Sequence, residues 1–66
     1  MTLGQKIKEL RVRNAYTLEN VANLSGLSIV TICVVENDKR VPSLSTLRKL
    51  ADALDVDVKE LTALLK

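Results

Sequence analysis

The sequence predicts an all-α, compact domain of five short helices, and three observations lead to this class. Leucine and alanine, which favour helices, supply 12 and 5 of the 66 residues, while Gly4, Gly26 and Pro42 alone are of helix-breaking types. Apolar residues recur at helical spacing, and a Ser, Thr or Asp stands before each run as a helix cap. A chain this short buries only about 60% of its unfolded surface, so we expect a single domain over residues 1–66.

The first two helices have clear start and stop signals. Thr2 and Gln5 form a capping-box pair before the first helix. Thr17 is a good N-cap for the second helix, and Gly26 follows it directly, where a left-handed backbone commonly closes a helix. The residues expected to face inward are Leu3, Ile7 and Leu10 in the first helix, which ends at Asn14 and Ala15, and Leu18, Val21 and Ala22 in the second.

The third element begins after Ser28, and local rules disagree about it. Six of the seven residues from 29 to 35 are β-branched, which by propensity indicates a buried strand. As a helix the same segment costs roughly 3 kcal/mol relative to alanine. Every other segment is predicted to be helical, however, so a strand here would have no partner for its amides and carbonyls. The sequence therefore predicts a helix that tertiary packing stabilises.

A polar loop and two more helices complete the chain. The loop covers residues 37–42 and ends in a proline at a helix entry. Ser43 or Ser45 caps the fourth helix, and Asp57 with Glu60 forms a capping box for the fifth. The fourth helix carries an apolar stripe of Leu44, Leu47, Leu50, Ala51 and Leu54, and the fifth carries Leu61, Leu64 and Leu65.

The residue inventory excludes several classes of function. With no His and one Cys, the chain has neither a Ser-His or Cys-His nucleophile nor a zinc set, so we expect no enzyme activity and no cofactor. The spacing of Asp52, Asp55 and Asp57 does not fit a calcium loop, so no metal is expected. The unpaired Cys favours a cytoplasmic location, and the longest apolar run, residues 29–35, is far below the roughly 20 residues of a membrane span. Neither a membrane nor a small-molecule substrate is expected as a partner.

Charge is unevenly distributed along the chain. Residues 1–14 carry a balance of +3 and residues 36–50 one of +2, whereas the last sixteen residues carry −2. Such a chain can present a basic face to a polyanion, although a mixed solvated surface gives nearly the same balance.

Residues 17–36 combine a short helix, a glycine turn and a second helix. A small residue at Ala22 lets the two helices cross closely, Gly26 makes the bend, and Ile32 with Val35 anchors the second helix. A pair of this kind projects the outer face of its second helix as a rod that fits the major groove of DNA.

In this arrangement the chain resembles the lambda-repressor-like, Cro/repressor-type (XRE-like) helix-turn-helix domains. The resemblance covers almost the whole chain and is carried by residues 3–11, Thr17, Glu19, Val21, Ala22, residues 26–28, Thr31, Ile32, residues 35–37, residues 42–44, Leu47, Leu50, Ala51, Ala53, Leu54, Val56 and Leu61. It implies a DNA-binding domain in which helices 2 and 3 form the helix-turn-helix and residues 28–36 are the recognition helix.

The resemblance also implies roles for individual residues. Those expected to face the bases are Leu18, Ile29, Val30, Cys33 and Val34. Those expected to contact phosphate are Thr17, Thr31, Asn37, Lys39 and Arg40, together with the start of the first helix. Arg11 and Glu36 stand where family members commonly form an internal ion pair.

The base-facing set departs from the family pattern. Family members usually carry Gln at position 18 and polar residues at 29, 30, 33 and 34, whereas here all five positions hold apolar residues or Cys. None of these side chains can make the paired hydrogen bonds that read guanine or adenine, but they can contact thymine methyl groups. Any sequence preference would then also depend on DNA shape.

Two functions fit this sequence. The first is a sequence-specific transcriptional regulator of phage or bacterial repressor type, which binds double-stranded DNA at an operator as a homodimer. The alternative is a protein-interaction or dimerisation module that retains the scaffold with weakened or lost DNA readout, because contiguous exposed aliphatic residues often mark protein interfaces. The apolar residues expected to contact a second copy are Val58, Leu61, Leu64 and Leu65.

Overall fold

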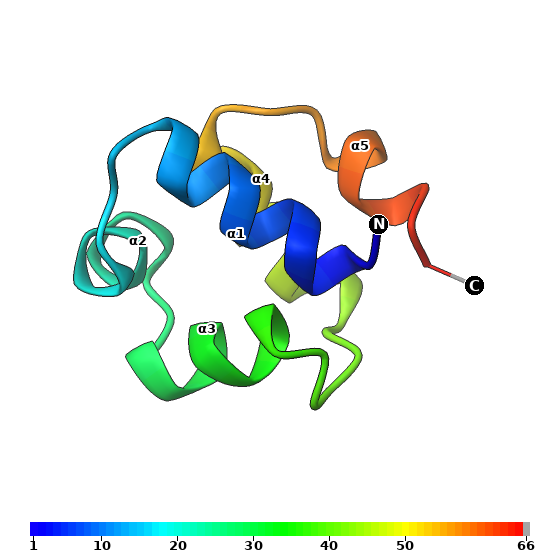
Figure 1. Cartoon of the computed structure of the whole chain (residues 1–66), viewed down its shortest axis with the longest axis horizontal. Helices are drawn as coiled ribbons and strands as arrows, with labels where there is room; N and C mark the ends of the chain where they lie inside the picture. The colour runs from blue at the N-terminus through cyan, green and yellow to red at the C-terminus, as the bar shows by residue number, and fades with distance from the viewer. Residues whose placement is uncertain (66) are drawn as a thin grey trace.

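The computed structural model describes residues 1–65 and contains five helices within them (Figure 1). They are α1 (Leu3–Arg13), α2 (Leu18–Ser25), α3 (Ile29–Glu36), α4 (Leu44–Leu54) and α5 (Val58–Thr62). No strand occurs in the described part of the chain. The predicted all-α class and the order of five helices are confirmed.

The predicted caps of the first two helices form. The Thr2 hydroxyl accepts a hydrogen bond from the amide of Gln5 at 3.1 Å, and the amide of Thr2 donates to Gln5 Oε1 at 2.8 Å. Thr17 makes the same reciprocal pair with Asn20, at 3.0 and 2.9 Å. Gly26 ends α2 in the left-handed conformation, with φ of 74°. Local sequence therefore determines where α1 and α2 start and where α2 stops.

The β-branched segment is helical, as predicted. Ser28 caps α3 by accepting from the amide of Thr31 at 3.1 Å, and α3 leaves α2 at a bend of 114°. The side chains of Ile32 and Val35 are 0% and 3% exposed. Burial of these two residues against α1 and α2 offsets the poor helix propensity of the segment.

The structure corrects two details of the last helices. The predicted capping box of α5 does not form, because Asp57 Oδ1 accepts from the amide of Lys59 at 2.9 Å and the amide of Glu60 bonds the Asp57 carbonyl. Leu44 belongs to the predicted apolar stripe of the fourth helix, but it stands at the first position of α4 and is 50% exposed, unlike the buried Leu47, Leu50 and Leu54. Of the two candidate caps, Ser43 is the one used, and it accepts from the amide of Thr46 at 3.2 Å.

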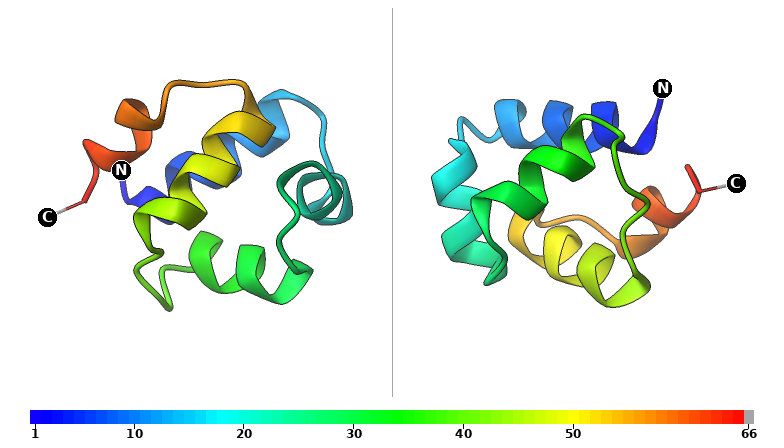
Figure 2. Two further views of the ribbon diagram at one scale, coloured as in Figure 1. Left: turned by 180° about the vertical axis from the view of Figure 1, so that it is seen from behind. Right: turned by 90° about the horizontal axis from the view of Figure 1, so that it is seen from below.

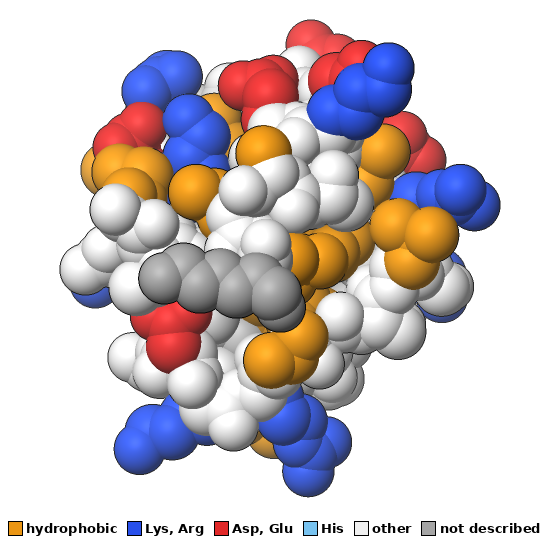
Figure 3. All heavy atoms as spheres, turned by 90° about the vertical axis from the view of Figure 1, so that its right-hand side faces the viewer, with side chains coloured by type: hydrophobic (Ala, Val, Ile, Leu, Met, Phe, Trp, Pro, Cys, Tyr) orange, Lys and Arg blue, Asp and Glu red, His pale blue; other side chains and the backbone are white. Residues whose placement is uncertain are grey.

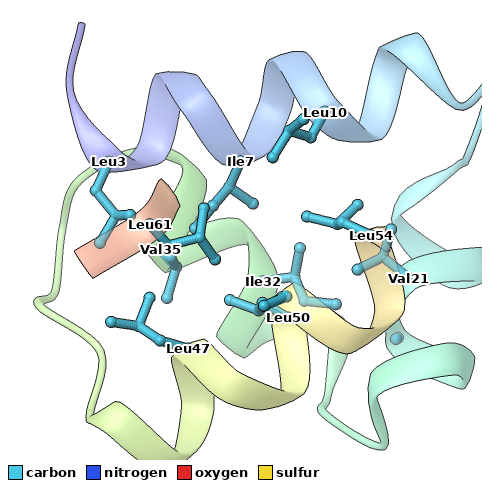
Figure 4. Close-up of a cluster of buried hydrophobic side chains, with 12 residues drawn as sticks. Leu3, Ile7, Leu10, Val21, Ile32, Val35, Leu47, Leu50, Leu54 and Leu61 are labelled. Carbon is cyan, nitrogen blue, oxygen red and sulfur yellow. The ribbon is translucent and has the colours of Figure 1, made fainter. Parts of the chain in front are cut away.

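All five helices contribute to one hydrophobic core (Figure 4). Its buried members are Leu3, Ile7, Leu10, Val21, Ala22, Ile32, Val35, Leu47, Leu50, Ala51, Leu54 and Leu61. α1 and α4 lie on opposite sides of this cluster, with α3 closing it from below in the view of Figure 1. The core therefore holds α3 by its inner face and leaves its outer face uncovered.

Within residues 1–65, no single helix is long and apolar enough to cross a membrane. α2 and α3 reach that length and composition only when taken together, across their bend of 114°.

Candidate nucleic-acid interface

The outer face of α3 exposes apolar side chains at its first turn. Val30 is 71% exposed and Ile29 is 43% exposed, while Cys33 is half-buried. The right-hand view of Figure 2 has α3 in front, with no other helix between it and the viewer. The first turn of α3 is therefore free to contact a macromolecule.

Two of the predicted base-facing residues lie partly in the core instead. Val34 and Leu18 are half-buried and pack against the core cluster, which for Leu18 confirms the inward orientation predicted from its spacing in the second helix. Val34 is half-buried because it lies beside the loop that follows α3 and the start of α4, where it lines a hollow with Val41, Pro42 and Thr46. The structure therefore brings Ile29, Val30 and Cys33 together on one face, and it leaves Val34 and Leu18 at the margin of that face.

Three of the predicted phosphate contacts use their polar side chains to cap helices. Thr17 accepts from the amide of Asn20. The hydroxyls of Thr31 and Ser28 lie 2.9 Å apart and form a hydrogen bond. Asn37 Nδ2 donates to the carbonyl of Cys33 at 2.8 Å, which closes α3. These residues fix the ends of α2 and α3, and only their remaining donors and acceptors are free for a ligand.

Lys39 and Arg40 are the exposed cations closest in sequence to α3. Both lie in the loop that follows α3, and both are exposed. No acidic side chain of residues 1–65 forms an ion pair with either of them. Their charge is therefore available to a polyanion at the edge of the α3 face.

Arg11 and Glu36 form the ion pair that the resemblance implies. Arg11 Nε donates to Glu36 Oε2 at 2.7 Å and Arg11 Nη2 donates to Glu36 Oε1 at 3.1 Å, a bidentate arrangement. The side chains are 14% and 6% exposed, and Arg11 Nη1 also donates to the Tyr16 carbonyl at 3.1 Å. Hydrogen bonding to Glu36 raises the pKa of Arg11, although burial acts in the opposite direction. The pair joins the last turn of α1 to the end of α3.

The start of α1 is not open to phosphate, which corrects the prediction made for it. Asp38 Oδ1 accepts from the amide of Gly4 at 3.0 Å, and the amide of Gln5 already bonds Thr2. The basic charge of α1 is also partly neutralised, because Arg13 pairs with Glu9 at 2.7 Å and Lys6 approaches the same carboxylate at 3.9 Å. The contact between Asp38 and Gly4 was not predicted, since no local signal in the sequence connects residues 34 positions apart.

The predicted dimer residues divide into buried and accessible ones. Leu61 is 0% exposed within the monomer, so the prediction that it contacts a second copy is wrong. Val58 and Leu64 are half-buried against the core, and Leu65 is 37% exposed. Leu64 and Leu65 line a shallow hollow of about 260 Å³ with Leu3, Asp38, Arg40 and Val41. Figure 3 looks onto the side of the molecule that carries α5, where hydrophobic side chains show between charged ones.

No metal site is evident in the described part of the chain. Among residues 1–65, no three Cys, Asp or Glu side chains are grouped so that they can hold an ion.

Comparison with known proteins places this arrangement in a family. A helix-turn-helix family model matches residues 7–61. The HTH-type transcriptional regulator RghRB of Bacillus subtilis strain 168 is 41% identical over 61 residues, which cover 91% of this chain and 44% of that protein. The immunity repressor protein of Bacillus phage phi105 is 40% identical over 58 residues, covering 88% of this chain and 40% of the repressor. The chain thus spans less than half the length of these two relatives.

A solved structure agrees with the sequence comparisons. The restriction-modification controller protein C.AhdI from Aeromonas hydrophila superimposes with a TM-score of 0.86 at 41% identity, and the match covers 89% of each chain. The five-helix order, the bend between α2 and α3 and the family match over residues 7–61 agree with one another. This chain belongs to the lambda-repressor-like helix-turn-helix family.

Proposed function

We propose that residues 1–66 form one DNA-binding domain of a transcriptional regulator of repressor type. The observation that carries the proposal is the uncovered outer face of α3 next to Lys39 and Arg40, two exposed cations that form no ion pair within residues 1–65. A helix face flanked by cations fits the major groove of a duplex, whose phosphates line both edges. The names of the relatives, a transcriptional regulator, an immunity repressor and a controller protein, support the same assignment.

In this proposal α3 reads bases and the following loop binds phosphate. Val30 and Ile29 enter the groove and contact thymine methyl groups, since neither side chain has a hydrogen-bond donor or acceptor. Lys39 and Arg40 bind phosphate without regard to sequence. The remaining specificity comes from DNA shape.

We further propose that two copies bind one operator. The apolar surface for a two-fold contact comes from Leu65 and the half-buried Leu64 and Val58. Leu61 does not take part, because it is buried in the core of the monomer. The recognition helices of such a dimer would meet half-sites about 34 Å apart. The protein would act by occupying DNA in the cytoplasm, and not as an enzyme.

Replacing Lys39 by alanine tests the proposal through its salt dependence. We expect the variant to bind mixed-sequence duplexes more weakly than the wild type and to lower the slope of log affinity against log salt by about one unit, because one phosphate contact is lost. Fluorescence anisotropy across a salt series measures both quantities. Lys59→Ala, in α5, is the control and should leave the slope unchanged. A wild-type protein that binds no duplex at low salt would refute DNA binding.

The alternative function, a protein-interaction module, is favoured by the exposure of Val30 and Ile29. Apolar side chains gathered on one helix turn also fit a protein partner. Val30 is a better probe of this than Val34, since only Val34 packs on the core and would destabilise the domain if changed.

Val30→Lys separates the two functions. If α3 binds DNA, the added cation should strengthen non-specific binding at low salt, because each phosphate contact contributes through charge alone. If the face binds protein, the same change should abolish a complex or oligomer seen by analytical ultracentrifugation. In that case the presence of a duplex should not alter the sedimentation of the wild type. Circular dichroism should show an unchanged fold in either case, since Val30 is 71% exposed.

A further inference from the structure

We propose that Asp38 is a positioning residue for DNA binding, because its carboxylate fixes the loop that carries Lys39 and Arg40 to the start of α1. This role rests on the proposed DNA-binding function, whereas the contacts that produce it belong to the free protein.

The carboxylate of Asp38 binds two groups of the first turn of α1. Oδ2 accepts from the hydroxyl of Thr2 at 2.6 Å, and Oδ1 accepts from the amide of Gly4 at 3.0 Å. The Thr2 hydroxyl accepts in turn from the amide of Gln5 at 3.1 Å, so this single hydroxyl joins the helix cap to the loop. A negative charge at a helix N-terminus is also favoured by the helix dipole.

Gly4 makes this approach possible. A Cβ at this position would lie 2.6 Å from the carbonyl oxygen of Val35 and 2.8 Å from Asp38 Oδ1, and it would also meet the carbonyl oxygen of Glu36. The backbone of α1 therefore lies directly against the last turn of α3 and the carboxylate of Asp38. Only a residue without a side chain fits there.

The backbone of Asp38 adopts a conformation that glycine would adopt more easily. Its φ is 56°, in the left-handed region that is unfavourable for a residue with a Cβ. The backbone amides of Asp38 and Lys39 donate to the carbonyls of Val35 and Val34, which attaches the loop to α3. The side chain of Asp38 adds the attachment to α1, and this is the contribution that a glycine would lack.

Two attachments therefore join α1 to the DNA-facing part of the molecule. The Arg11–Glu36 pair binds the end of α3, and the Asp38 contacts bind the start of the loop. Lys39 and Arg40 follow Asp38 directly, so their backbone starts from a fixed point. A fixed start lowers the freedom that these two side chains lose when they bind phosphate.

Charge alone predicts the opposite effect of Asp38, which makes the role testable. The carboxylate stands beside two cations that are proposed to bind a polyanion, and it repels phosphate. If Asp38 acted only through charge, its removal would strengthen DNA binding. If it acts by positioning, its removal weakens binding despite the more favourable charge.

The experiment compares Asp38→Gly with Asp55→Gly. Asp55 ends α4 with φ of 58°, and within residues 1–65 its side chain makes no hydrogen bond, so the control removes the same charge and the same backbone strain without a contact. Fluorescence anisotropy with a mixed-sequence duplex at low salt gives the affinities. The measurement is made at a temperature well below the melting temperature of each variant. We expect Asp38→Gly to bind about 3- to 10-fold more weakly than the wild type, the cost of ordering one long side chain. Asp55→Gly should bind at least as tightly as the wild type.

A second readout does not depend on DNA. Hydrogen exchange of the Lys39 amide, which bonds the Val34 carbonyl in the free protein, should be faster in Asp38→Gly than in the wild type and unchanged in Asp55→Gly. Unchanged exchange at this amide, or duplex affinity in Asp38→Gly equal to or above that of the wild type, would overturn the positioning role. If the wild type itself binds no duplex, the proposed function fails, and the exchange rates still decide whether Asp38 fixes the loop. If Asp38→Gly does not fold, Thr2→Ala takes its place, because it removes the hydroxyl that binds Asp38 Oδ2 and keeps the carboxylate, so charge alone predicts unchanged binding and positioning predicts weaker binding.

Discussion

Arg11→Met is expected to destabilise the domain by about 3 to 5 kcal/mol, because it leaves the carboxylate of Glu36 buried without its partner. Glu36 is only 6% exposed, and both of its oxygens bind the Arg11 guanidinium. A domain of 66 residues has a total stability of about 3 to 10 kcal/mol, so the variant should be close to unfolded at room temperature. Urea unfolding followed by circular dichroism measures the change.

Two further variants show that the loss comes from the unpaired carboxylate. Arg13→Met breaks the exposed pair with Glu9 and should cost at most about 0.5 kcal/mol, since surface pairs contribute little. The double variant Arg11→Met, Glu36→Leu should recover most of the stability, because an apolar pair can replace a buried ion pair. A loss in Arg11→Met no larger than that in Arg13→Met would contradict this account.

The stabilisation from Arg11 should not vary with pH near neutrality. The pKa of Arg11 is raised above its already high ordinary value, chiefly by hydrogen bonding to Glu36. When folding raises the pKa of a basic group, the group contributes fully to the free energy of unfolding at any pH below its ordinary pKa. This contribution is lost only as the pH rises through the folded-state pKa. The guanidinium therefore stays charged at and around neutral pH, and stability measured by urea unfolding across that range should show no change that arises from Arg11.

Gly4→Ala is expected to lower the free energy of unfolding by about 2 kcal/mol, although alanine favours a helix by about 1 kcal/mol over glycine. The new Cβ would lie 2.6 Å from the Val35 carbonyl oxygen and would also meet that of Glu36, and backbone atoms cannot rotate away as a side chain can. The strain of forcing α1 from α3 should therefore exceed the gain in propensity. The melting temperature should fall by about 8 to 16 °C, measured by differential scanning calorimetry.

The second glycine serves as the control for this prediction. Gly26 has φ of 74°, and a Cβ built on it meets nothing within 4 Å. Gly26→Ala should cost about 1 to 2 kcal/mol through the backbone alone, without disturbing the contact between α1 and α3. NMR shift changes at Val35 and Glu36 should therefore appear in Gly4→Ala and be absent in Gly26→Ala. A Gly4→Ala variant as stable as the wild type would show that the two helices can separate at little cost.

The sequence predicted the helices well because their signals are local. Thr2, Thr17 and Ser28 each cap a helix through an amide three positions away, and Gly26 closes α2. The helical state of residues 29–36 was predictable only by elimination, since the segment had no strand to pair with.

The candidate site was predicted less completely. The ion pair of Arg11 and Glu36 followed from the family resemblance, and the exposure of Ile29 and Val30 agrees with their predicted outward orientation. Val34 and Leu18 were assigned to the same face but pack partly on the core. Half-turn differences in orientation of this kind depend on which neighbouring helix lies against the residue, and spacing alone does not specify that.

Local chemistry, then, established the helices, their caps and the family to which the chain belongs, because capping and apolar spacing act within four residues. Packing between distant segments determined the rest: that Leu61 is buried and Leu44 is not, and that Asp38 occupies the start of α1 from 34 residues away. Those outcomes depend on how closely two backbones approach in space, and a linear pattern of residue types does not encode that distance.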